Sequence, residues 1–176
     1  MKKIIICSLL SALCVGAANA VLPHVGFYQT IDDETSQPKS IVAVYEYSSG
    51  DDVQVGGRIV ALYDETGKIS ETLSNPVRVA DKVSGSPKMV GLDIIWGMEW
   101  DADDNEYEDG KIMDPKKGSV YSSVMWADKK DASKFNVRGK IGPFGRTQTW
   151  NVMQASDLPA DLQKLDMSKW TPVVVK

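Results

Sequence analysis

Cysteine and histidine are nearly missing from this chain of 176 residues. The two cysteines, Cys7 and Cys14, lie within the first 20 residues, and His24 is the sole histidine. The rest of the chain therefore has no thiol for a disulfide or a thiolate, and too few histidines for a conventional zinc site. We expect no structural or catalytic metal, no cofactor and no catalytic triad, and we expect His24 to lie exposed on a loose leader.

Long apolar runs are also scarce. Residues 4–15 form an apolar run of twelve, which is shorter than the roughly 20 residues that a membrane-spanning helix needs. Two lysines precede this run, and a small-x-small cleavage site follows at residues 18–20, so residues 1–20 are expected to be a signal peptide cleaved near Ala20. The alternative is a lipid anchor on Cys14, but Leu13 stands where such sites have a small residue. We expect a periplasmic or secreted protein.

Positive charge is in deficit. The whole chain has 20 Lys and Arg against 24 Asp and Glu, and without Lys2 and Lys3 the counts are 18 and 24, a net charge of −6. No run of basic residues interrupts this balance. It argues against nucleic acids and anionic lipid surfaces as partners, because both need a basic face.

Short strand patterns and turn residues, by contrast, are abundant. Eight strands are expected, at residues 26–30, 40–47, 53–63, 92–100, 106–113, 119–126, 134–141 and 146–152. Residues 68–90 are less regular. Many short adjacent strands predict an all-β fold, a single closed antiparallel up-and-down barrel, because closure removes exposed strand edges. Eight strands enclose an interior that is either filled by side chains or holds one small ligand.

The barrel domain is expected to cover residues 21–154, followed by a tail at 155–176. Ser156 or Asp157 could cap a short helix with Pro159 in its first turn, ending near Leu165. Trp170 and the apolar residues 173–175 predict that the tail packs onto the barrel.

Glycine, proline and arginine motifs follow one another along the strands. In order they are Gly57-Arg58-Ile59, Pro87 ahead of Gly91-Leu92, Gly110-Lys111-Ile112, Asp114-Pro115, Gly118 with Tyr121, Arg138-Gly139, and Gly145-Arg146 with Gln148 and Trp150. In this combination the chain resembles a family of secreted bacterial proteins named domain of unknown function 2147. The resemblance implies a small lipocalin-like barrel without established chemistry, in which these motif residues are structural positions.

The two ends of the expected barrel depart from the lipocalin pattern. Lipocalin-like barrels often begin with Gly-x-Trp and close with an Arg lying on that Trp, whereas this chain has Gly26-Phe27-Tyr28 and, in the last strand, Val152. We therefore expect closure through an apolar or tyrosine-mediated contact.

The acidic stretch at residues 101–109 begins like a calcium loop, with oxygen ligands at positions one, three and five. It then has Glu106 where such a loop requires Gly, and Ile112 where it requires a bidentate Glu. A solvated hairpin tip is the preferred interpretation, and weak calcium binding is the alternative.

The last strand gives the most specific prediction about a site. Arg146, Gln148, Trp150 and Val152 share one face, so Arg146 and Gln148 should point inward with Trp150. A buried guanidinium needs a partner, which could be an internal carboxylate, such as Glu108 or Glu46, or an anionic group on a ligand. The two interpretations, a structural ion pair at the barrel mouth and a ligand contact, both stay open.

We therefore expect an exported barrel that binds a small amphipathic molecule. The candidate ligand contacts are Arg146, Gln148, Trp150, Tyr121 and Glu108. The alternative is a structural or interaction protein with a packed barrel. An enzyme comes third, because only carboxylates such as Glu108 and Asp114 could act as acid and base, and they would have to converge.

Overall fold

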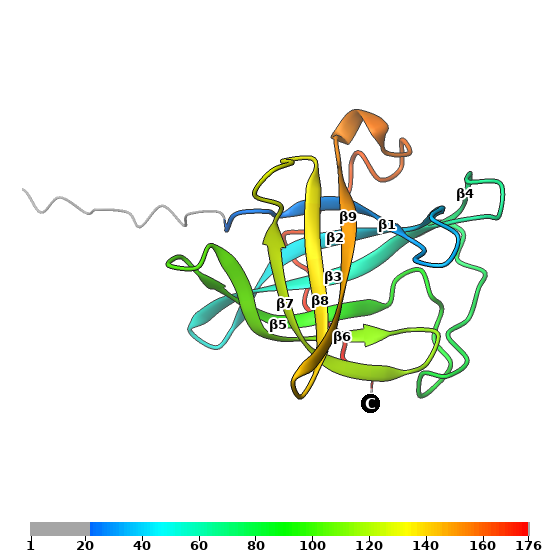
Figure 1. Cartoon of the computed structure of the whole chain (residues 1–176). Coiled ribbons are helices and arrows are strands. Elements are labelled where there is room, and N and C mark those ends of the chain that lie inside the picture. Colours follow the sequence, from blue (N-terminus) through cyan, green and yellow to red (C-terminus); the bar gives the residue numbers. More distant parts are fainter. Residues whose placement is uncertain (1–21, 176) are drawn as a thin grey trace, which may run out of the picture.

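The computed structural model describes residues 22–175, so the expected signal peptide lies outside the described residues. Nine β-strands run through this part of the chain (Figure 1). They are β1 (Gly26–Ile31), β2 (Pro38–Ser49), β3 (Asp52–Tyr63), β4 (Ile69–Thr72), β5 (Asp93–Asp101), β6 (Glu106–Asp114), β7 (Ser119–Ala127), β8 (Lys134–Ile141) and β9 (Phe144–Met153). No helix in residues 22–175 is long and apolar enough to cross a membrane.

Eight of the strands form a closed antiparallel barrel, as predicted. Their order is β2-β1-β9-β8-β7-β6-β5-β3, and pairing between β2 and β3 closes the ring. The remaining strand, β4, pairs with the end of β3 and lies outside the ring. It was not predicted, because it has four residues within the irregular stretch 68–90 and too few positions to show an alternating pattern.

Alternation along the strands separates the barrel interior from its outer surface. On β2, Val42 and Val44 join the large interior cluster, while Ile41 and Ala43 belong to a second cluster on the outside. Gly57 on β3 lies within the interior, where an added Cβ would stand 3.1 Å from the Ile95 side chain. The barrel thus has two apolar layers, one inside it and one beneath the C-terminal tail.

Two of the motif glycines are fixed by close packing. An added Cβ at Gly110 would lie 2.0 Å from the Met98 sulfur and 2.9 Å from a backbone oxygen. Gly118 has a φ of 68°, and its added Cβ would lie 2.2 Å from the Lys82 carbonyl oxygen. Gly118 ends the tight β6–β7 turn at Asp114-Pro115, in which the Asp114 carbonyl accepts the Gly118 N–H at 2.8 Å. The sequence motif therefore marks a turn that touches a distant loop.

The tail covers the outer face of β2 and β3. Leu158 and Leu162 are buried there with Ile41 and Ala61. The predicted helix is not formed: a 3-10 turn at Ala155–Asp157 is the only helical element within residues 22–175, and simple turns follow it. Burial of separated apolar side chains, rather than helical hydrogen bonding, positions this segment.

Farther along, the tail is held by an ion pair between two barrel strands. Arg58 of the Gly57-Arg58 motif makes two hydrogen bonds to Asp93, at 2.9 and 2.8 Å, and its guanidinium lies 4.4 Å from the Trp170 ring centre. Asp93 also accepts the Tyr45 hydroxyl at 2.7 Å and the Val173 N–H at 2.8 Å. The packing expected for Trp170 is confirmed, whereas the Val173 side chain is exposed and only its backbone is held.

One end of the barrel is closed by aromatic rings. Tyr28 is buried, its ring centre is 4.7 Å from that of Phe135, and its hydroxyl donates to the His24 carbonyl at 2.6 Å. Tyr28 lies opposite Val152 in the β1–β9 ladder. The expected tyrosine-mediated closure is therefore present.

The prediction that His24 lies on a loose leader is wrong. Its ring lies 5.6 Å from Phe135 and 5.9 Å from Trp100, centre to centre, inside the plug that closes this end. The neighbouring Pro23 carbonyl accepts the Tyr107 hydroxyl. Position near a terminus suggested exposure, but the aromatic rings at this end of the barrel supply an apolar surface that residues 23 and 24 cover.

Burial lowers the pKa of His24. The folded protein resists protonating this ring, whereas the unfolded chain protonates near pH 6.5, so stability should decline as pH falls through that region. We expect the drop in melting temperature between pH 7.5 and pH 5.5, about one pH unit either side of the unfolded pKa, to be smaller in His24→Asn than in the unaltered protein. Asparagine tolerates the φ of 61° at this position. An unchanged pH dependence would contradict this role for His24.

Candidate functional site

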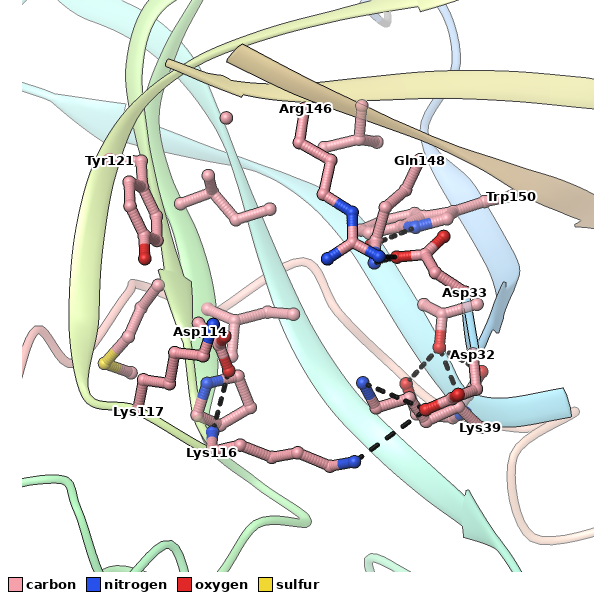
Figure 2. A pocket seen from close by; sticks show the side chains of 18 of the residues that line it. Asp32, Asp33, Lys39, Asp114, Lys116, Lys117, Tyr121, Arg146, Gln148 and Trp150 are labelled. Carbon is pink, nitrogen blue, oxygen red and sulfur yellow. Dashed lines mark hydrogen bonds and ion pairs between the residues drawn. The ribbon is translucent and has the colours of Figure 1, made fainter. Parts of the chain in front are cut away.

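A cavity of about 500 Å³ opens at the other end of the barrel. It is framed by the end of β1, the start of β2, the β6–β7 turn and the β8–β9 hairpin. Figure 2 looks into it, with Tyr121 on one wall and Arg146, Gln148 and Trp150 on the facing wall. The volume lies within the range of roughly 300–1,000 Å³ that small-molecule sites occupy.

The wall of the cavity is mainly apolar. Its apolar lining comes from Ile31, Ile59, Leu62, Met89, Ile94, Ile112, Met113, Val137, Ile141, Phe144 and Trp150. Gly139 also lines it, and an added Cβ there would make only ordinary contacts of 3.5 Å with Ile112 and Tyr121. The absence of a side chain at Gly139 thus contributes to the open volume.

Charged side chains surround the mouth. The β1–β2 loop supplies Asp32, Asp33 and Glu34, and basic residues face them: Lys39, Lys116, Lys117 and Arg146. Asp32 lies 3.8 Å from both Lys39 and Lys116. Backbone N–H groups of Thr35 and Glu34 lower the pKa of Asp32, with the two lysines adding to the effect. The Asp32 carboxyl is therefore ionised at neutral pH, at a rim of polar side chains above an apolar wall.

A chain of polar contacts runs from the buried indole to this rim. Trp150 Nε1 donates to Gln148 Oε1 at 3.3 Å, and Gln148 Nε2 donates to Asp33 Oδ2 at 2.7 Å. The Arg146 guanidinium meets the same oxygen at 2.5 Å. Figure 2 shows the Asp33 carboxylate beside the ends of Arg146 and Gln148. The predicted common face of Arg146, Gln148 and Trp150 is present.

The ion pair expected for Arg146 at the barrel mouth is present, but the suggested partners, Glu108 and Glu46, were wrong. The partner is Asp33, and the Arg146 side chain is 67% exposed rather than buried. Glu46 lies at the closed end, where it accepts the Leu22 N–H. Asp33 lies in the loop between β1 and β2. Pairing of β1 with β9 brings its loop beside Arg146, a contact across more than a hundred residues that no local pattern shows.

Glu108 does not line the cavity. Strict alternation would put residues 108, 110 and 112 on one face, but the ladder shifts between Tyr107 and Gly110, where Asp109 has a φ of 58°. This bulge turns Tyr107 inward and Glu108 out toward Glu99, Asp101 and Asp103 in a shallow acidic depression. Desolvation and the neighbouring carboxylates raise the pKa of Glu108.

The acid–base pair that an enzyme would need is consequently not assembled from Glu108 and Asp114. They stand near opposite ends of β6, and only Asp114 lines the cavity. The acidic stretch itself forms the β5–β6 hairpin tip, in which the Asp101 carboxylate accepts the N–H groups of Asp103 and Asp104.

The remaining motif residues are structural in their placement. Arg138 lies on the outer face and donates to Thr147 at 3.2 Å, and an added Cβ at Gly145 would come within 2.7 Å of that guanidinium. Pro115 and Asp114 form the turn at the mouth. Met89 is a lining residue that the sequence did not reveal, because it comes from the irregular stretch between β4 and β5.

The fold and cavity define a lipocalin-like barrel of eight strands. The chain belongs to the family described as uncharacterized proteins conserved in bacteria (DUF2147), whose profile matches residues 26–152. Among solved structures it is similar to protein HP1028 from the human pathogen Helicobacter pylori, which is described as belonging to the lipocalin family. That likeness has 15% identity and a TM-score of 0.53, and it covers 81% of this chain and 89% of the other. No curated protein matches the chain significantly.

Proposed function

We propose that this protein binds a small amphipathic molecule, with its apolar part inside the barrel and its polar group at the mouth. The observation that supports the proposal is the cavity of about 500 Å³, apolar along its wall and charged at its rim. Transfer of apolar surface from water into such a wall is favourable by about 25 cal/mol per Å². A packed barrel acting through its surface, the alternative, would leave no such space.

Basic side chains at the rim can hold an anionic head group, although Asp32, Asp33 and Glu34 stand there too. Arg146, Lys39, Lys116 and Lys117 line the mouth, and Gln148 and the Trp150 indole add uncharged donors below them. An incoming carboxylate or phosphate would take the place of Asp33 on Arg146 and Gln148. Because Asp33 is itself 30% exposed, it can return to water when displaced.

Filling the cavity should weaken binding strongly. Gly139→Leu places a branched side chain into the lumen, and we expect a fluorescent fatty-acid analogue to bind this variant at least about tenfold more weakly, since each methylene excluded from burial costs about 0.8 kcal/mol. Gly139→Ala is the matched control, because its Cβ makes only ordinary contacts. Titration of each variant with the analogue, followed by quenching of tryptophan fluorescence, measures the two affinities. Failure of the unaltered protein to bind any amphiphile would favour the packed-barrel alternative.

Loss of the guanidinium at the mouth should have a smaller effect. We expect Arg146→Met to weaken binding of an anionic amphiphile about threefold to tenfold, the scale of one charge-assisted hydrogen bond in a partly hydrated place. Binding of the corresponding neutral alcohol should not change. Arg138→Met makes the same substitution on the outer face of the same hairpin and should leave both affinities unaltered. Equal effects of the two substitutions would show that Arg146 does not contact the head group.

We also propose that the protein is exported and begins at Val21. The support is the charged start, the apolar run of residues 4–15 and the small residues before Val21. Intact-mass measurement of the protein from cells should give the chain cut after Ala20. A diacylglycerol adduct on Cys14 would instead establish the lipid anchor.

A further inference from the structure

Two large apolar side chains stand exposed beside the mouth of the cavity. Ile141 and Phe144 face each other across the β8–β9 hairpin, and they are 65% and 79% exposed. Figure 1 shows this hairpin at the lower edge of the molecule, away from the start of β1. Both residues also line the mouth. With Val173 and Val77 they are the most exposed large apolar residues in residues 22–175, and nothing in the described chain covers them.

Charge is segregated along the barrel in a way that the net charge conceals. Residues 110–122 and 138–148, which form the two hairpins on this side of the mouth, contain six Lys and Arg residues and one Asp. Residues 99–109, at the closed end, contain seven Asp and Glu residues and no Lys or Arg. The acidic β1–β2 loop lies across the mouth, but Asp33 is engaged by Arg146, and Asp32 lies near Lys39 and Lys116.

The protein is therefore an electrostatic dipole whose positive end carries an apolar tip. In front of a negatively charged surface it would turn the basic hairpins forward and the acidic β5–β6 tip away. Lysines at this end include the exposed Lys117 and Lys140. Their long side chains allow the apolar tip to enter the lipid while the ammonium groups stay beside the lipid phosphates.

We propose that the open end of the barrel docks on an anionic lipid bilayer, with Ile141 and Phe144 inserted among the lipids. This occupant fits better than a protein, because lysine is depleted in the cores of protein interfaces. A second copy related by a two-fold axis would bring the basic hairpins of both molecules together. The proposal replaces the expectation drawn from net charge that anionic lipid surfaces are excluded, and it holds whether or not the cavity binds a ligand.

The test is partition of the protein onto vesicles of phosphatidylcholine with and without phosphatidylglycerol. The chain beginning at Val21 is used, because the fold lies within residues 22–175 and the apolar run of residues 4–15 would bind vesicles by itself. We expect binding to the anionic vesicles only, and we expect it to weaken as salt is raised.

Two pairs of variants locate the contact. Lys117→Ser with Lys140→Ser should reduce partition about tenfold or more, on the scale of roughly fivefold for each lysine at the surface. Lys129→Ser with Lys130→Ser makes the same charge change in the exposed β7–β8 loop at the closed end and should change partition less than about twofold. Phe144→Ser should likewise reduce it about tenfold, whereas Val53→Ser, 51% exposed at the closed end, should not.

Three results would overturn the proposal. One is equal partition onto neutral and anionic vesicles, and a second is equal loss from the open-end and closed-end variants. The third is self-association in sedimentation velocity that Phe144→Ser abolishes, which would assign the apolar tip to a second copy of the chain. None of these results bears on binding of a soluble amphiphile in the cavity, so the two proposals fail separately.

Discussion

Arg58→Met is expected to lower the free energy of unfolding by about 3–5 kcal/mol, because it leaves a buried carboxylate without its counter-ion. The Asp93 side chain is fully buried and the Arg58 side chain is 17% exposed. The Tyr45 hydroxyl and the Val173 N–H still donate to Asp93, so the loss should fall in the lower half of that range. Urea unfolding at neutral pH, followed by circular dichroism, measures it.

The chain offers a matched control for this prediction. Arg146 also pairs with an aspartate, but its side chain is 67% exposed, so Arg146→Met should cost no more than about 1 kcal/mol. Arg58 also lies against Trp170 and donates to the Thr171 carbonyl at 3.2 Å. Arg58→Met, unlike Arg146→Met, should therefore also release the tail and speed up proteolysis after residue 165. Similar unfolding free energies for the two variants would show that burial of the Arg58–Asp93 pair adds nothing.

Glu71→Ala is expected to destabilise the protein by about 2–4 kcal/mol, because one buried carboxylate holds the loop between β4 and β5. It accepts the backbone N–H groups of Val77 and Arg78 at 2.7 and 2.8 Å, and it pairs with the Arg78 guanidinium. That loop carries Met89 into the cavity wall, so ligand affinity should fall together with stability.

The pH dependence of this effect has a definite sign. Burial alone would raise the pKa of Glu71, but hydrogen bonds and the charge of Arg78 outweigh it and lower the pKa below its usual 4.5. The carboxylate therefore stabilises the fold above pH 4.5, and this contribution is lost as pH falls through the lowered pKa. The difference between Glu71→Ala and the unaltered protein should shrink in acid, whereas Glu71→Gln, which keeps an acceptor, should lose less at neutral pH. A difference that stays constant with pH would contradict the assignment.

The location of the site on β9 could be predicted, whereas its partners could not. The common face of Arg146, Gln148 and Trp150 follows from alternation within one strand, which is a local property. Asp33 belongs to a loop that reaches Arg146 only after β1 pairs with β9. Glu108 was misplaced because a single bulge at residues 108–109 reverses the alternation that placed it inside.

The sequence by itself determined the class of fold, since strand alternation and turn chemistry act over a few residues and leave closure as the way to remove free edges. It also determined that a charged residue would share the face of Trp150. Only the tertiary structure decided that one barrel end is plugged by His24, Tyr28 and Phe135 while the other stays open. Whether an end of the barrel is plugged or open depends on how completely side chains from separate strands fill the volume they share. No single segment of the chain contains that information.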